Sequence, residues 1–332
     1  LQRFMPRLIS LVVQCQEPLL ALDRTLSVIN RILRRSAYVS LLNENLVATR
    51  RLVQLCESSS YVAAQLARYP VLLDELLEPR IATERIEKAE FEAELAIRSA
   101  HLQGSDSEDR MEMLAQFQRA SLFRIAVADF SGSLPIMKVS DSLTFLAEAV
   151  LDHALESAWL DLTAKHGVPH YDIDGERHAA GFGVIGYGKL GGLELSYGSD
   201  LDLVFLHDSK GGRQVTDGEK PLDNAIFFGR LVRRLVHFLT TQTSSGVMYE
   251  IDTRLRPEGR KGVLVTSTDA IQRYQQENAW TWEHQALLRA RPVAGSETVA
   301  KTFERIRART LMSRVRLDAL RDDVVSMRTR MR

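Results

Sequence analysis

The chain has 332 residues, too many for one ordinary hydrophobic core, so two or three folding units are expected. Hydrophobic residues make up 45% and charged residues 26%, which is typical of a soluble globular protein. The 43 basic and 43 acidic residues cancel, so no overall charge favours nucleic acid or an anionic membrane, and neither is expected as a partner. Any phosphate chemistry must therefore be local.

Cysteine use and apolar run length bear on the compartment. Cys15 and Cys56 are the only cysteines and show no metal or redox spacing, which predicts a cytoplasmic protein in a reducing environment. The early apolar stretch from Leu8 to Val13 is too short to cross a bilayer. The chain starts and stops inside helical patterns, so we interpret it as a fragment.

The first half of the chain has a helical pattern, divided into a region over residues 1–103 and a second over 104–170 that leads into the next domain. A loop around residues 103–109 separates the two helical groups, and no strand is predicted before residue 180. This half is expected to pack, position or communicate. Two apolar stripes alternate steps of three and four residues: Leu19, Leu22, Leu26, Ile29 and Leu33, and later Leu151, Leu155, Ala158 and Leu162.

After a turn-rich stretch over residues 167–181, strands and helices alternate. Strands are predicted at 182–185, 201–206 and 247–252, and helices at 224–241 and 268–278. The pattern predicts an α/β domain over residues 171–300. A truncated helical segment follows over 301–332; its ten basic and four acidic residues are interpreted as a solvated helix face rather than a docking patch.

A glycine turn after the first predicted strand resembles a dinucleotide-binding fingerprint. Gly186, Gly188 and Gly191 match the pattern G-x-G-x-x-G, and Asp208 follows 22 residues after the first glycine. However, only nine residues separate Gly191 from Leu201, too few for a crossover helix between parallel strands. A Rossmann strand buried on both faces should also not open with aspartates. The nicotinamide interpretation is therefore rejected.

Two aspartates at the start of the second predicted strand carry the main functional signal. Alternate strand residues share a face, so Asp200 and Asp202 are expected to point the same way, roughly 6.5 Å apart along the backbone. Two such carboxylates repel unless a cation lies between them, which predicts a divalent-metal site. The preceding glycine turn offers backbone amides to phosphate oxygens, and Lys189 adds a positive charge. Nucleotidyl transfer combines these features with a third carboxylate.

Asp252 is the candidate for that third carboxylate. It ends a predicted strand, and Thr253-Arg254-Leu255-Arg256 continues the alternation. If the extended geometry persists, Asp252, Arg254 and Arg256 share one face and the two guanidiniums can hold phosphate. The alternative is an internal salt-bridge ladder of aspartate and arginine.

Three segments in order resemble a known family. They are GYGKLGGLELSYGSDLDLVF at 186–205, YEIDTRLRP at 249–257 and NAWTWEHQALLRAR at 278–291. Together they are similar to the bifunctional glutamine synthetase adenylyltransferase and adenylyl-removing enzymes, which contain two nucleotidyltransferase domains of the polymerase-β type. The third segment resembles the carboxy-terminal, adenylylating half. The resemblance implies an α+β fold: an N-terminal helical bundle, a polymerase-β-type domain and a C-terminal helical segment.

The resemblance also implies roles for individual residues. Asp200, Asp202 and Asp252 would be the catalytic carboxylates and the ligands of Mg²⁺ or Mn²⁺. Gly188, Ser199 and Lys189 would contact the triphosphate of ATP. The implied reaction transfers AMP from ATP to a tyrosine hydroxyl of glutamine synthetase and releases pyrophosphate. Control by a PII signalling protein and by glutamine is implied as well.

Two alternatives remain open at this point. The same carboxylates could serve the reverse chemistry, in which phosphate removes the adenylyl group. Alternatively, the fragment is chiefly a regulatory helical scaffold that binds a PII protein or glutamine synthetase with little activity of its own. Trp280 and Trp282 could stack on adenine, but packing is the favoured interpretation, and no histidine is assigned chemistry.

Overall fold

A computed structural model describes residues 4–33, 35–77, 87–102 and 104–312, with 321, 322, 325 and 329 beyond them. The chain divides into two compact units, one of Leu1–Phe91 with Gln116–Leu146 and one of Glu92–Ala115 with Ala147–Arg332. The expected boundaries at residues 103, 170 and 300 do not coincide with this division. Helices α7 (Ser107–Phe130) and α8 (Ile136–His166) each contribute residues to both units.

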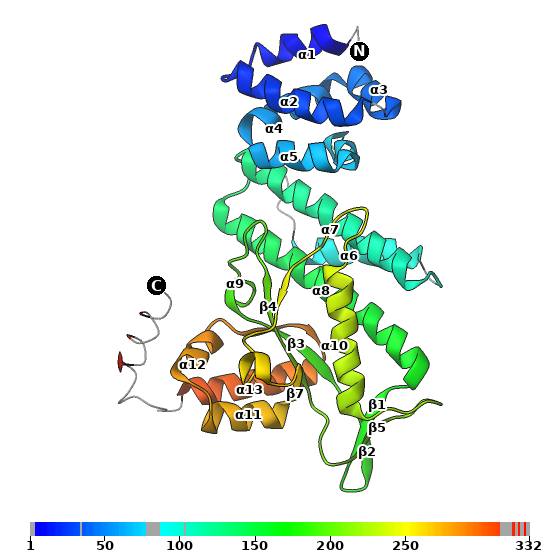
Figure 1. The fold of residues 1–332 in the computed structure, drawn as a ribbon, viewed down its shortest axis with the longest axis vertical. Coiled ribbons are helices and arrows are strands. Elements are labelled where there is room, and N and C mark those ends of the chain that lie inside the picture. The colour runs from blue at the N-terminus through cyan, green and yellow to red at the C-terminus, as the bar shows by residue number, and fades with distance from the viewer. Residues whose placement is uncertain are drawn as a thin grey trace. The chain divides into compact units, whose positions relative to one another are not determined.

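The first unit is helical, as predicted. Its elements are α1 (Phe4–Val12), α2 (Pro18–Ile32), α3 (Ser36–Glu44), α4 (Leu46–Ser58), α5 (Ser60–Arg68) and the 3₁₀ helix η1 (Pro70–Leu77), drawn in blue in Figure 1. Side chains of Asn45 and Ser59 accept hydrogen bonds from the first turns of α4 and α5, which satisfies backbone amides that have no partner inside the helix. Cys15 and Cys56 are free thiols.

One of the two predicted apolar stripes is wrong. In α2 the buried positions are Ala21, Thr25, Val28, Ile29 and Ile32, while Leu19 is 84% exposed. The buried face is rotated relative to the leucines because packing partners, not the largest apolar side chains, decide which face is covered. The later stripe is confirmed, because all four of its residues in α8 are buried.

Helix α6 (Lys88–Ala100) also contributes residues to both units, and the second unit contains a small antiparallel sheet in the order β2-β1-β5. Its strands are β1 (Pro169–Ile173), β2 (Glu176–Ala179) and β5 (Gly212–Thr216). This corrects the expectation that no strand precedes residue 180. Asp174 and Gly175 join β1 to β2 with positive φ angles of 52° and 84°, the backbone of a tight hairpin turn.

The main sheet has five strands: β3 (Phe182–Gly186), β4 (Leu201–His207), β6 (Ile251–Asp252), β7 (Val265–Ser267) and β8 (Arg291–Gly295). The order is β6-β4-β3-β8, and β7 pairs with β4 further along it. Strands β3 and β4 are antiparallel, and only α9 (Gly188–Gly191) stands between them. Rejection of the dinucleotide-binding fold is therefore confirmed, since that fold needs a parallel pair joined by a full helix.

Helices cover both faces of this sheet (Figure 1). On one face, Phe228 of α10 (Asn224–Thr240) stacks on Phe182 and His207. On the other, Ile185, Val204 and Leu206 share a core with α11 (Thr268–Glu277), α12 (Thr281–Leu287) and α13 (Glu297–Met312). The structure is thus mixed α+β. The predicted C-terminal helical segment is confirmed up to Met312, and most of its remainder lies outside the described residues.

Across the described part of the chain, we find no helix with the length and apolar character needed to span a membrane.

Candidate active site

Strands β4 and β6 bring the predicted carboxylates together. The two strands run parallel, with Leu201 opposite Ile251 and Asp202 opposite Asp252. Residues paired in this way place their side chains on the same face of the sheet. Strand β4 begins at Leu201, as predicted, so Asp200 directly precedes the strand and only Asp202 lies on it; Asp200 is exposed, whereas Asp202 is half-buried.

The glycine turn approaches Asp202 closely. Gly188 has a φ of +54°, and a Cβ atom built on it would lie 2.2 Å from Oδ2 of Asp202. The Tyr187 amide donates to the Asp202 carbonyl at 2.9 Å and fixes the turn against β4. Only glycine fits at position 188, because any side chain would collide with the carboxylate and would strain the backbone.

The three carboxylates differ in their electrostatic environment. Burial raises the pKa of Asp202, and the negative charges of Asp200 and Asp252 raise it further. Hydrogen bonding to Arg254 lowers the pKa of Asp252. Arg254 and Lys189 offset part of the repulsion at Asp202. The site therefore concentrates negative charge that its own cations compensate only in part.

The chain turns directly after Asp252, so the expected extended face is wrong. The Arg254 amide and Nε donate to the two Asp252 oxygens at 2.8 and 2.6 Å. Arg256 donates from Nη1 to the Thr253 carbonyl and hydroxyl, both at 2.8 Å, and so holds the turn. The salt-bridge alternative is thus observed for Arg254. It arises because the Asp252 side chain accepts from an amide two residues later, a pattern that favours a turn over a strand.

A cavity of about 640 Å³ opens beside these residues, within the size range of small-molecule sites. Its polar lining combines carboxylates with guanidiniums, a pairing suited to a metal-bound phosphate. Gly188, Lys189, Ser199 and Asp202 lie outside this lining; Lys189 is exposed, and Ser199 exchanges a hydrogen bond with the Ser196 hydroxyl at 2.9 Å. The lining residues are Asp200, Glu250, Ile251, Asp252, Thr253, Arg254, Arg256 and Arg260.

An ion pair between Glu148 and Arg291 supports the glycine turn, and it was not predicted. Glu148 of α8 is only 4% exposed and pairs with Arg291 of β8. Arg291 also donates to the carbonyls of Leu190 and Gly191, each at 3.1 Å. The pair therefore fixes the end of α9 relative to the sheet. A sequence signal did exist, since Glu148 stands among Leu146, Ala147, Ala149 and Val150 and a glutamate there needs a buried partner.

The donor set suits a divalent cation. Carboxylate oxygens are the preferred ligands of Mg²⁺ and Mn²⁺, and a cation would offset both the burial and the carboxylate repulsion that raise the pKa of Asp202. Among the described residues, no three acidic, histidine or cysteine side chains are already arranged as a metal cluster. Asp252 is engaged by Arg254 and would have to exchange that contact for the metal.

Fold and site together define a mixed α+β protein with a carboxylate and arginine site at the edge of a sheet. A family model described as glutamate-ammonia ligase adenylyltransferase matches residues 49–306. The chain therefore belongs to this family, and the resemblance inferred from its three sequence segments is confirmed.

Relatives support the same conclusion over the full chain. Bifunctional glutamine synthetase adenylyltransferase/adenylyl-removing enzymes from Thioalkalivibrio sulfidiphilus, Pseudomonas putida and Pseudomonas syringae pv. tomato are 48%, 49% and 50% identical to it. Each match covers 100% of this chain and 34% of the relative. The chain thus spans about a third of the length of these curated relatives.

Proposed function

We propose that this chain transfers AMP from ATP to a tyrosine hydroxyl of glutamine synthetase and releases pyrophosphate. The observation that carries the proposal is the register of Asp202 with Asp252 on parallel strands, with Asp200 adjacent. The family membership and the names of the relatives support the choice of reaction. We assign the second unit's sheet and helices to a polymerase-β-type nucleotidyltransferase domain.

Asp200, Asp202 and Asp252 would hold Mg²⁺ or Mn²⁺. When bound there, the metal would supply positive charge to offset the negative charge of the α-phosphate and of the pyrophosphate leaving group. Amides of the glycine turn and Lys189 orient the triphosphate, and the Ser199 hydroxyl adds a donor. Arg256 and Arg260 line the cavity, and their guanidinium groups bind oxygens of the same triphosphate.

The nucleophile needs its proton removed, because an unperturbed tyrosine has a pKa of about 10. Asp252 accepts the proton from the tyrosine hydroxyl. The phenolate oxygen then forms a bond to the α-phosphorus, and the bond from that phosphorus to the bridging oxygen of pyrophosphate breaks. Arg254 lowers the pKa of Asp252, and a metal ion bound in its place would lower it as well, so this carboxylate is a weak base. Catalysis therefore depends mainly on placement and electrostatics.

Glutamine synthetase is the proposed protein substrate, and a PII signalling protein and glutamine are the proposed regulators in the cytoplasm. The helical first unit fits a role in positioning or communication between such partners.

The experiment supplies the purified chain with ATP and unmodified glutamine synthetase, and separately with phosphate and adenylylated glutamine synthetase. Labelled AMP on glutamine synthetase in the first assay is the expected result, and chelation of divalent metal should abolish it. Removal of AMP in the second assay without transfer in the first would assign the chain to the adenylyl-removing reaction. The relatives' names include both reactions. Binding of both proteins without either turnover would assign a scaffold.

A further inference from the structure

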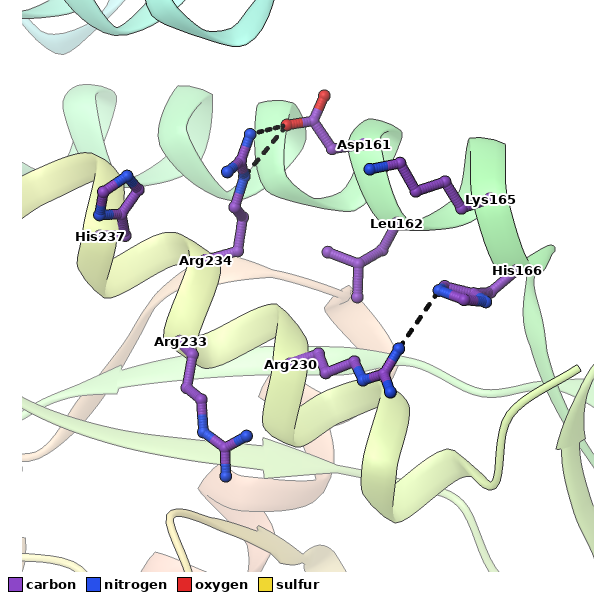
Figure 2. Close-up of a pocket in the computed structure, with 8 residues that line it drawn as sticks. All are labelled: Asp161, Leu162, Lys165, His166, Arg230, Arg233, Arg234 and His237. Carbon is purple, nitrogen blue, oxygen red and sulfur yellow. Dashed lines mark hydrogen bonds and ion pairs between the residues drawn. The ribbon is translucent and has the colours of Figure 1, made fainter. Parts of the chain in front are cut away.

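A second concave site lies between α8 and α10, and its polar lining is almost entirely basic. Its volume is about 410 Å³, and it shares no residue with the candidate active-site cavity. Figure 2 shows Arg230 and Arg234 extending from α10 toward α8, with Leu162 of α8 between the two helices. The lining residues are Asp161, Leu162, Lys165, His166, Arg230, Arg233, Arg234 and His237.

The sequence of α10 concentrates positive charge on one face. Arg230, Arg233, Arg234 and His237 are spaced by three and four residues, while Phe227, Leu231 and Leu235 bury the other face. Like charges at this spacing repel and weaken a helix. Lys165 lies in the last turn of α8, where a positive charge is stabilised by the helix dipole. Arg230 and Arg233 lie in the middle of α10, where the helix dipole does not stabilise a positive charge.

The only carboxylate in the lining is already neutralised. Asp161 accepts from Arg234 at 2.8 and 3.2 Å and also pairs with Arg110. Burial alone would raise the pKa of Asp161, but these two guanidiniums outweigh burial and lower it. Four lysine and arginine side chains thus line the site against one carboxylate.

The remaining cations are available to a ligand. Arg230 makes a 3.4 Å contact with Nε2 of His166, whose Nδ1 donates to the Lys220 carbonyl at 2.8 Å. Lys165 and Arg233 are exposed and form no hydrogen bond or ion pair with other residues in the described parts of the chain. In Figure 2, Arg233 points away from α8, so Lys165, Arg230 and the fixed Arg234 are the cations nearest the groove between the helices.

We propose that this groove binds a small, multiply charged phosphate compound at a site separate from the active site. The volume suits a phosphorylated small molecule, and guanidinium groups bind phosphate oxygens through paired hydrogen bonds. The lining residues of both helices belong to the second unit, so the cations come from two helical segments of one compact unit. An acidic protein segment would also meet positive charge here, but a hollow of only about 410 Å³ favours a compact phosphate anion.

The test uses inorganic tripolyphosphate as the probe and titration calorimetry as the readout. Titrations run on the whole chain at fixed ionic strength, with a chelator present so that metal-dependent phosphate binding in the active site is suppressed. The test variant is Lys165→Gln with Arg230→Gln. The matched control is Lys301→Gln with Arg309→Gln, which removes the same charges from exposed positions of α13. Thermal unfolding verifies that each variant is folded.

We expect the wild-type chain and the α13 control to bind tripolyphosphate, and the groove variant to lose at least about tenfold in affinity. Equal binding by the groove variant and the control would overturn the proposal. A loss confined to Arg256→Gln with Arg260→Gln would place the anion in the active site and also overturn it. Binding of a polyglutamate peptide without any binding of tripolyphosphate would assign the groove to protein partners instead.

Discussion

Asp202 and Asp252 lie opposite each other on two parallel strands, although 50 positions separate them in the chain. Their register places both side chains on the same face of the sheet. The adjacent turn accepts only glycine at position 188, because a Cβ atom there would collide with the Asp202 carboxylate. One charge is partly buried and the other is held by Arg254. This relationship underlies the proposed transfer reaction.

Gly188→Ala is expected to lower AMP transfer by at least about 100-fold, since a small misplacement of reacting groups costs that much. The new Cβ would lie 2.2 Å from the Asp202 carboxylate and force the turn and the aspartate apart. Steady-state turnover measures the effect. Gly175→Ala is the matched control, because Gly175 also has a positive φ but no atom within 4 Å of the added Cβ. Equal losses in the two variants would mean that backbone strain alone explains the effect.

Arg291→Met should lower the free energy of unfolding by about 3–5 kcal/mol, because it leaves the buried Glu148 carboxylate without its partner. Urea unfolding measures this change. The double variant with Glu148→Met should regain most of that stability, because neither charge remains. AMP transfer should stay low in the double variant, since the carbonyls of Leu190 and Gly191 still lack their donor. Full activity in a stable double variant would show that the pair is purely structural.

Arg256 and Arg260 both line the active-site cavity but should respond differently to substitution. Arg256→Gln removes hydrogen bonds to Thr253 and Gly262 and should cost about 1–3 kcal/mol of unfolding free energy, besides raising the KM for ATP. Arg260→Gln should raise this KM by about tenfold while leaving stability unchanged, because its exposed side chain has no hydrogen-bond or ion-pair partner among the described residues. A wild-type KM in Arg260→Gln would exclude it from phosphate binding.

The stability of the second unit should fall as the pH drops below 6.5. Burial lowers the pKa of His207 from 6.5 to about 4, and its Nδ1 accepts from the Ser209 amide. Between pH 6.5 and pH 4, His207 is protonated in the unfolded chain but neutral in the folded chain. The free energy of unfolding therefore falls by up to about 3 kcal/mol as the pH drops through this range. His207→Asn keeps an acceptor and does not titrate. Unfolding measured from pH 7 to pH 4 should decline less in this variant, and identical profiles would rule out His207 as the cause.

Strong local patterns predicted many of the elements around the site. The strands at β3 and β4 and the helices α10 and α11 combine long apolar faces with clear ends, and the structure has them within a residue or two of the expected bounds. The hairpin of β1 and β2 was missed because all four residues of β2 are exposed and give no alternation. Its one signal was the turn pair Asp174-Gly175.

Contacts between residues far apart in the chain could not be predicted from local sequence patterns. Glu148 and Arg291 are 143 residues apart, so their pairing depends on how α8 and β8 pack. The groove between α8 and α10 was likewise not predicted, because its charges come from two helices that no motif connects. At Arg254 the error was local, since the turn formed by the Asp252 side chain competes with the expected strand.

The role of Asp202 in AMP transfer is tested most directly by comparing Asp202→Asn with Asp172→Asn, which alters a β1 aspartate outside the active-site cavity. Each variant and the wild-type chain receives labelled ATP, Mg²⁺ and glutamine synthetase, and labelled AMP on tyrosine is counted. We expect transfer by the wild type and by Asp172→Asn, and none above background by a folded Asp202→Asn. Wild-type transfer by Asp202→Asn would contradict this role.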